Sequence, residues 1–289
     1  TLTKSFTCGS TTGGSITTAP NLAITAGASI PTFTTGSWFN NLDFTGSTAT
    51  PAVSTVNVTG NLTLAAGGTY TNLSITAAGT GTITNNAKTI AGFIVNNGAG
   101  TVTLSAALSV ATFTQTAGTI NFATFNLTCS STATYVSGTF NNLSTITCTT
   151  FTNSGTFAFS SGTITPSVAF GTTAGTFTYS GTAVLSAVPT FTQTAGNVTL
   201  NKAYALTATG TYTIAGGTLT LGGVDLTTGA FASTGTVTRS IAFSTFNIVL
   251  AHTTAATAVL SMSTVTNFTW SGTGGFTASA AVTRTFAFG

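Results

Sequence analysis

Charged side chains are almost missing from this sequence. They make up 2% of its 289 residues and include no Glu, whereas soluble domains carry about a quarter charged residues. The charges are scattered along the chain, at Lys4, Lys88, Lys202, Arg239, Arg284, Asp43 and Asp225. Nucleic-acid binding requires a basic patch and calcium loops require clustered acids, so neither function is expected.

Helix formers, histidine and long apolar runs are also scarce. The chain has one His, three Cys and one Met, a poor set for holding a metal ion. No apolar run reaches the roughly 18 residues that a transmembrane helix needs, so no membrane insertion is expected. Thr, which favours strands, is the commonest residue. We therefore expect an all-β protein that uses no cofactor, with disorder disfavoured by 42% hydrophobic residues and 22 Phe.

One short phrase returns ten times: Gly, then Thr or Asn, an apolar residue, a spacer, and usually a second apolar residue. The copies follow one another at intervals of 17 to 21 residues, and they begin at Gly60, Gly81, Gly100, Gly118, Gly138, Gly155, Gly175, Gly196, Gly217 and Gly235. A fixed period in this range is typical of chains that stack one structural unit on the next.

Three apolar columns keep nearly this period. The phrase itself supplies the first column, which includes Phe140, Phe157 and Phe177, with Phe159 and Tyr179 two residues further on. The second column precedes the Gly and comprises Val56, Val95, Phe113, Phe151, Phe170, Phe191, Tyr212 and Phe231. The third follows it and comprises Ile90, Leu108, Leu127, Ile146, Ile164, Val184, Leu206 and Leu226. Because alternate strand residues face opposite sides, each column predicts one inward-facing strand per period.

Three strands per coil of about 19 residues predict a parallel β-solenoid, specifically a right-handed β-helix. Like residues then stack on like residues about 4.8 Å apart, so the Phe and Tyr of the first two columns should form ladders inside. The segment Thr112–Gly118 recurs unchanged at Thr190–Gly196, 78 residues later, or four coils. A β-sandwich is the competing architecture, but it would show turn signals every 8–12 residues without columns in constant phase.

The two ends depart from this pattern. We expect an N-terminal cap over 1–55, a regular solenoid over 56–240 and a C-terminal cap or docking segment over 241–289. Similar segments occur near both ends, as Leu2-Thr3-Lys4-Ser5-Phe6 and Val282-Thr283-Arg284-Thr285-Phe286. This similarity is either chance in a Thr-rich chain or a sign of end-to-end docking, with Leu2, Lys4, Phe6, Arg284, Phe286 and Phe288 as the candidate contact residues. The chain opens at Thr1, which predicts a removed signal peptide or a segment of something longer.

The cysteines are placed one coil apart. Cys129 and Cys148 each follow an apolar residue and a Thr, so both should point inward and stack. A spacing near 4.8 Å lies within the disulfide range of about 4.4–6.8 Å, but side chains of in-register parallel strands point the same way and would strain the bridge. Buried thiols are therefore favoured over a disulfide. Cys8 is expected to be a buried thiol or a link to another subunit.

The scarcity of acids argues against an enzyme. Glycoside hydrolysis uses two carboxyl groups about 5–9.5 Å apart, whereas Asp43 and Asp225 are 182 residues apart, roughly nine coils and about 45 Å in the predicted stack. His252 is the one histidine, and a Ser-His-Asp triad would need an orienting acid that the sequence does not place beside it. No catalytic residue is predicted.

The period, the Gly-Thr-apolar-x-apolar phrase and the charge-poor Thr, Ser and Asn surface resemble β-helical surface proteins over about residues 56–240. The resemblance is to bacterial adhesins of the filamentous-haemagglutinin and autotransporter-passenger type, and phage fibre repeats are similar. It implies an extracellular or cell-surface protein that extends or adheres. We expect a structural subunit that assembles with itself head-to-tail into a fibre or biofilm-like matrix. The alternative is an adhesin or virion fibre that binds polysaccharide or a receptor.

Overall fold

The computed structural model describes residues 19–24, 33, 36–47, 50–52, 54–253, 258–278 and 285–288, the last range by its backbone alone. The chain divides into two compact units, Thr1–Thr147 (unit 1) and Cys148–Gly289 (unit 2). The point of division lies within β13 (Thr145–Asn153).

Nearly all regular structure is β-strand. Unit 1 contains β1 (Leu22–Ala23), β2 (Ser37–Phe39), β3 (Leu42–Asp43), β4 (Ser54–Val58), β5 (Leu62–Thr63), β6 (Tyr70–Ala77), β7 (Gly81–Thr84), β8 (Thr89–Leu104), β9 (Leu108–Asn121), β10 (Leu127–Cys129), β11 (Thr132–Tyr135) and β12 (Thr139–Asn141). Unit 2 contains β14 (Thr156–Phe159), β15 (Thr163–Thr172), β16 (Thr176–Tyr179), β17 (Val184–Leu185), β18 (Thr190–Gln193), β19 (Asn197–Leu200), β20 (Tyr204–Ala205), β21 (Thr211–Ile214), β22 (Gly217–Leu221), β23 (Leu226–Thr228), β24 (Ala230–Ser233), β25 (Arg239–Ser244), β26 (Ile248–Leu250), β27 (Ala258–Met262), the 3₁₀ turn η1 (Val265–Asn267), β28 (Phe268–Gly272), β29 (Phe276–Ala278) and β30 (Thr285–Phe288). In the part of the chain that the structure describes, no helix could span a bilayer.

Unit 1 winds as a parallel β-solenoid. The long strand β9 pairs in parallel with β8 of the preceding coil, and in the following coil it pairs in parallel with β10, β11 and β12. One strand is thus matched by three shorter strands, one for each face of the next coil. The earlier strands pair in the same way, as β2 with β4 and β4 with β6.

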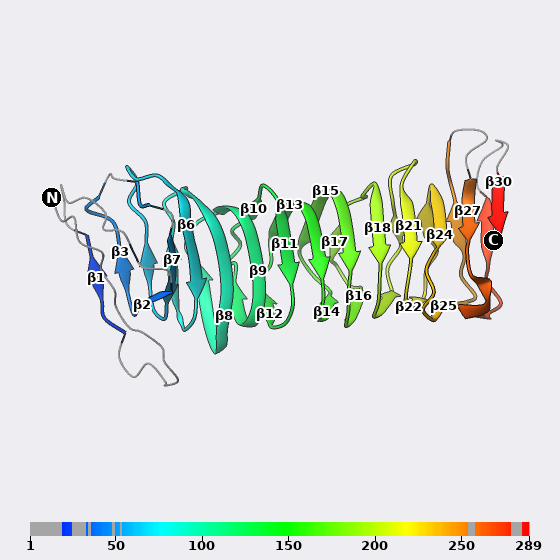
Figure 1. Ribbon diagram of the computed structural model, residues 1–289, viewed down its shortest axis with the longest axis horizontal. Coiled ribbons are helices and arrows are strands. Elements are labelled where there is room, and N and C mark those ends of the chain that lie inside the picture. The colour runs from blue at the N-terminus through cyan, green and yellow to red at the C-terminus, as the bar shows by residue number, and fades with distance from the viewer. Residues whose placement is uncertain are drawn as a thin grey trace. The chain divides into compact units, whose positions relative to one another are not determined.

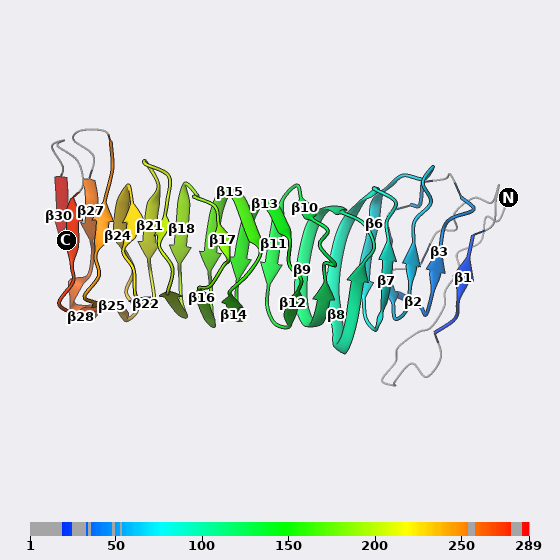
Figure 2. The ribbon, with the colours of Figure 1, turned by 180° about the vertical axis from the view of Figure 1, so that it is seen from behind.

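In unit 2 the strands stack along three faces. The first face contains β15, β18, β21, β24, β27 and β30, the second β14, β16, β19, β22, β25 and β28, and the third β20, β23, β26 and β29. Figure 1 shows β18, β21, β24 and β27 side by side, and Figure 2 shows the same order from behind. The predicted all-β parallel solenoid is confirmed, and the two units together contain about 11 turns.

Alternation along each strand produces the core. In Thr190–Gln193 the second and fourth residues are buried while the two Thr residues are half-buried, as expected for a strand with one inward face. The inward rings of Phe170, Phe191 and Tyr212 stack with centroids 4.8 and 4.7 Å apart. Each fully buried ring contributes about 1.5–3 kcal/mol through burial, and the stacking adds to it.

Glycines occupy the corners because the backbone is strained and crowded there. Gly196 and Gly217 have φ of +74° and +81°, a region that side chains with a Cβ rarely adopt. A Cβ on Gly217 would also overlap the carbonyl oxygen of Gly196 in the preceding coil. At these corners Gly is therefore required by both its own conformation and its neighbour in the preceding coil.

Two of the predicted columns slip out of register. In the second column Val95 pairs with Gln115, while Phe93 is the partner of Phe113. In the third column Val184 is 46% exposed, and the residue paired with Ile164 is Leu185.

A further slip in the third column places Tyr204, and not Leu206, beside Leu226. The spacing between strands changes from coil to coil, and the slips have two sizes. Val95 and Leu206 are displaced by two residues, so they stay on the inward face and are buried. Val184 is displaced by one residue, which turns its side chain to the outer face.

Parallel pairing also occurs in the segments that flank 56–240. Leu22 pairs with Leu42 and Leu42 with Leu62, and Arg239 pairs with Phe268, 29 residues further on. The period is lost after Arg239 because this coil carries an extra loop, while its strands keep the same pairing.

Candidate binding site

The residues of the predicted aromatic ladder lie inside their units. Phe157 and Phe177 are strand partners with ring centroids 6.0 Å apart, and Phe159 and Tyr179 are partners at 5.9 Å. The other buried members are Phe113 in unit 1 and Phe151, Phe170, Phe191, Tyr212 and Phe231 in unit 2.

Phe140 is less buried than the other members of the predicted ladder. It is half-buried, and its strand partner in unit 1 is Ile120, which precedes it in the same apolar column. Its ring lies 5.6 Å from Phe122 and 5.4 Å from Tyr135, both in edge-on contact. These two buried rings fill the interior at this level, so Phe140 cannot enter it fully.

The remaining predicted residues are placed as follows. Cys129 in β10 has Val110 as its strand partner, and Cys148 lies in β13; both are buried, and their stacking stays a prediction. In β30 the backbones of Phe286 and Phe288 pair with Leu260 and Met262. Four candidate contact residues, Leu2, Lys4, Phe6 and Arg284, lie outside the described residues, as does Cys8.

Both aspartates accept hydrogen bonds from backbone N–H groups. One carboxylate oxygen of Asp43 accepts a hydrogen bond from the backbone N–H of Thr45 at 2.8 Å, and Asp225 accepts one from Asn247 at 2.7 Å. His252 is buried. Among the described residues no group of three His, Cys, Asp or Glu side chains could hold a metal ion.

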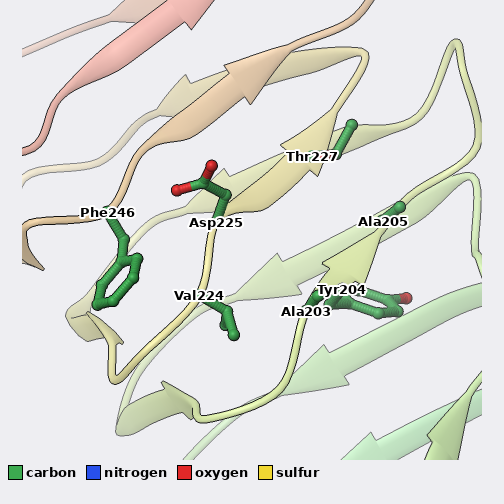
Figure 3. A pocket seen from close by; sticks show the side chains of 7 residues that line it. All are labelled: Ala203, Tyr204, Ala205, Val224, Asp225, Thr227 and Phe246. Atoms are coloured by element: carbon green, nitrogen blue, oxygen red, sulfur yellow. The ribbon is translucent and has the colours of Figure 1, made fainter.

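A hollow opens on the third face of unit 2. Its volume is about 450 Å³, and it is lined by Ala203, Tyr204, Ala205, Val224, Asp225, Thr227 and Phe246. Figure 3 shows that these side chains come from three successive coils, with Asp225 and Phe246 on one side and Tyr204 on the other. Volumes of about 300–1,000 Å³ are usual for small-molecule pockets.

Strand register explains why the hollow forms here. Tyr204 pairs with Leu226 and Ala205 with Thr227, so the exposed residues Ala203 and Ala205 point outward below Asp225 and Thr227. Two alanine methyl groups leave space that larger side chains would fill. The wall is completed by Phe246, which lies in a turn closed by a hydrogen bond from its N–H to the carbonyl of Phe243 at 2.9 Å.

The hollow carries one uncompensated negative charge. Among the described residues no cationic side chain lies within ion-pair distance of Asp225, which is exposed. Lys202, the neighbour of Ala203 in the sequence, donates to the carbonyl of Ala183 and lies over the ring of Tyr179. Burial raises the pKa of Tyr204, whose hydroxyl donates inward to the carbonyl of Ser186 at 3.2 Å. With a single carboxylate among its lining residues, the hollow can bind but lacks the acid–base pair of a hydrolase.

Buried amides next to the corners are a feature that sequence reasoning missed. Gln115 and Gln193 are fully buried, and each donates from Nε2 to the carbonyl of the Gly three residues later, at 2.9 Å. Asn153 makes the corresponding bond to Gly155 at 3.0 Å. The signal was present in the repeated segment Thr-Phe-Thr-Gln-Thr-Ala-Gly, where the Gln follows an inward Phe by two residues.

Arg239 was also missed as an interior residue. It is fully buried at the start of β25. Its guanidinium donates to Ser233 Oγ and to the carbonyls of Gly235, Val237, Ser263 and Thr264. Ser233 is the last residue of β24, Gly235 and Val237 follow it, and Ser263 and Thr264 follow β27 one coil later. One side chain therefore joins the corners of two successive coils.

Comparisons with protein-family models, with curated proteins and with solved structures found no match.

Proposed function

We propose that this chain is a non-enzymatic structural protein, an extracellular β-solenoid subunit that assembles head-to-tail into a fibre or surface matrix. The observation that carries the proposal is the exposure of Trp270. In unit 2 this residue continues an inward row: Leu219 pairs with Ile241 and Ile241 with Trp270. Ile241 is 1% exposed, whereas Trp270 is 66% exposed.

In unit 2 this row is buried from Phe157 to Ile241 and exposed at Trp270, so its exposed end needs a cover. β28 pairs with β25 and β29 pairs with β26, and no described strand pairs with their other edges. An open strand edge is a template for pairing with another strand. A second copy that presents a matching coil would hydrogen-bond to this edge and bury the Trp270 ring, and a head-to-tail contact of this kind propagates into a filament.

The test is assembly of the purified chain. Light scattering after size-exclusion chromatography and negative-stain electron microscopy should reveal filaments that grow with concentration. Trp270→Asp should reduce the filament mass at least about tenfold, because it places a charge in the buried row. Val168→Asp is the matched control. Val168 lies in β15 of unit 2, away from β28, and is 50% exposed. The filament mass of this variant should be unchanged. A chain that stays monomeric at every concentration, or equal loss in both variants, would contradict the proposal.

A second candidate function is that of an adhesin or virion fibre module that binds polysaccharide. The observation that favours it is the hollow beside Asp225, which offers an aromatic wall and a hydrogen-bonding carboxylate. If this is the function, the assembly experiment should show short isolated particles, and these particles should bind polysaccharide.

A further inference from the structure

Asp225 occupies a position where other coils carry asparagine. In the next coil Asn247 lies at the equivalent place, and its Oδ1 accepts a hydrogen bond from the N–H of Gly275 at 3.1 Å. Asparagines on another face make the same kind of bond: in unit 1 the Oδ1 of Asn41 accepts from the N–H of Asn61 at 2.8 Å, and that of Asn61 accepts from the N–H of Thr82 at 2.9 Å. An amide oxygen thus suffices for the bond that Asp225 makes to Asn247. The fold does not require the negative charge.

The charge is also left without a partner inside the protein. The described residues place no cation within ion-pair distance of Asp225, and the nearby Lys202 is engaged by Ala183 and Tyr179. In a chain with only 2% charged residues, this carboxylate is an isolated negative site. It will attract a cation in preference to a neutral or anionic group.

The walls of the hollow define the rest of the ligand. Ala203, Ala205, Val224 and the half-exposed ring of Phe246 form an apolar lining around the carboxylate, and Thr227 adds a hydroxyl. A ligand that fits combines an apolar face, hydroxyl groups and a positive charge. A sugar ring has both an apolar C–H face, which packs on aromatic rings, and hydroxyls. A sugar ring that also bears an ammonium group can contact the apolar lining, the Thr227 hydroxyl and the Asp225 carboxylate.

We propose that the hollow binds a protonated amino-sugar unit of a cationic polysaccharide, with the ammonium on Asp225 and the ring on Phe246. The site lies wholly in unit 2 and does not depend on assembly of the chain, so it goes beyond the proposed fibre. A lysine-rich protein segment would also bring a cation, but its narrow chain would leave much of a hollow of about 450 Å³ unfilled.

The test compares four probes by titration calorimetry at about pH 6, where the amines are protonated: a glucosamine tetramer, its N-acetylated form, a glucose tetramer and tetralysine. The glucosamine tetramer should bind at least about tenfold more tightly than the other three. No binding of that tetramer, equal binding of the acetylated form, or equal binding of tetralysine would each overturn the proposal.

Variants locate the site. Asp225→Asn keeps the bond to Asn247 that an amide oxygen makes elsewhere, and it should weaken binding about tenfold. Ala205→Leu, at an exposed outward position, fills the hollow and should do the same. Asp43→Asn removes the same charge in unit 1 and should change nothing. If Asp225→Asn and Asp43→Asn bind the glucosamine tetramer equally well, the proposal is wrong, whatever the outcome of the assembly experiment.

Discussion

Arg239 is a cation buried among carbonyl groups, with no acidic side chain of the described residues in ion-pair distance. Burying an unpaired charge is costly unless hydrogen bonds replace its hydration. Here four backbone carbonyls and Ser233 Oγ accept from the guanidinium. The rigid fork of an Arg can reach acceptors in the corners of two successive coils, which a Lys cannot.

We expect Arg239→Met to lower the free energy of unfolding of unit 2 by about 3 kcal/mol, because four part-buried carbonyls and the buried Ser233 hydroxyl lose their donor. Arg239→Lys should lower the free energy of unfolding by a smaller amount, since it keeps the charge and some donors. Urea unfolding followed by circular dichroism measures both.

The matched control is Lys88→Met in unit 1, a half-buried cation. It should change the free energy of unfolding by less than about 0.5 kcal/mol. An Arg239→Met variant as stable as the parent would show that the buried guanidinium is not needed to hold the two successive coils together.

At the scale of strands and corners, inward amides connect one element to the next. Gln193, the last residue of β18, donates to the carbonyls of Gly196 at 2.9 Å and Thr218 at 3.0 Å, and it accepts from the hydroxyl of Tyr212 at 2.8 Å. The side chain thereby joins three strands of two coils. Such a network rigidifies a corner when it is satisfied and is costly when it is broken.

Gln193→Leu should therefore destabilise unit 2 by about 2–3 kcal/mol, because two carbonyls and one hydroxyl lose their partner. Tyr212→Phe removes only the hydroxyl, and the two changes together should show a coupling of about 1 kcal/mol in a double-mutant cycle.

Gln115→Leu is the comparison within the same repeated segment. Gln115 donates to Ala117 and Gly118 but accepts from no described residue. Gln115→Leu should therefore lower the free energy of unfolding by less than Gln193→Leu does. Additive effects of Gln193→Leu and Tyr212→Phe would argue against a shared network.

At the scale of the whole chain, the titration of tyrosines sets the alkaline limit of stability. Burial raises the pKa of Tyr70, Tyr135, Tyr204 and Tyr212 above the ordinary value of 10.0. A group with a raised pKa in the folded state keeps its proton while the unfolded chain loses it. Stability is therefore complete below about pH 10 and falls as the pH rises further.

The free energy of unfolding should fall by about 1.4 kcal/mol per pH unit above pH 10 for each fully buried tyrosine. Urea unfolding at pH 9, 10 and 11 measures this slope. Tyr212→Phe should reduce the slope in unit 2, since Tyr212 is completely buried. Equal slopes for the two proteins would mean that Tyr212 ionises as easily when folded as when unfolded.

Much of the fold could be predicted from periodicity, because the inward rows repeat with a nearly constant coil length. Phe157 and Phe177 are partners as the phrase predicted. The rows failed where the spacing between strands changes, as at Val184, because a shift by one residue turns that side chain to the opposite face. The hollow could not be predicted at all. Ala203, Asp225 and Phe246 carry no motif, and their proximity depends on the register of three coils.

The winding of this chain follows from its periodicity, since three apolar columns separated by glycine are buried together when strands stack in parallel. The sequence by itself also determined that the surface is nearly uncharged. Only the tertiary structure decided which side of a coil each side chain faces, because facing depends on the lengths of corners between strands. For that reason the buried Arg239, the corner amides and the Asp225 hollow belong to the three-dimensional arrangement and not to any local pattern.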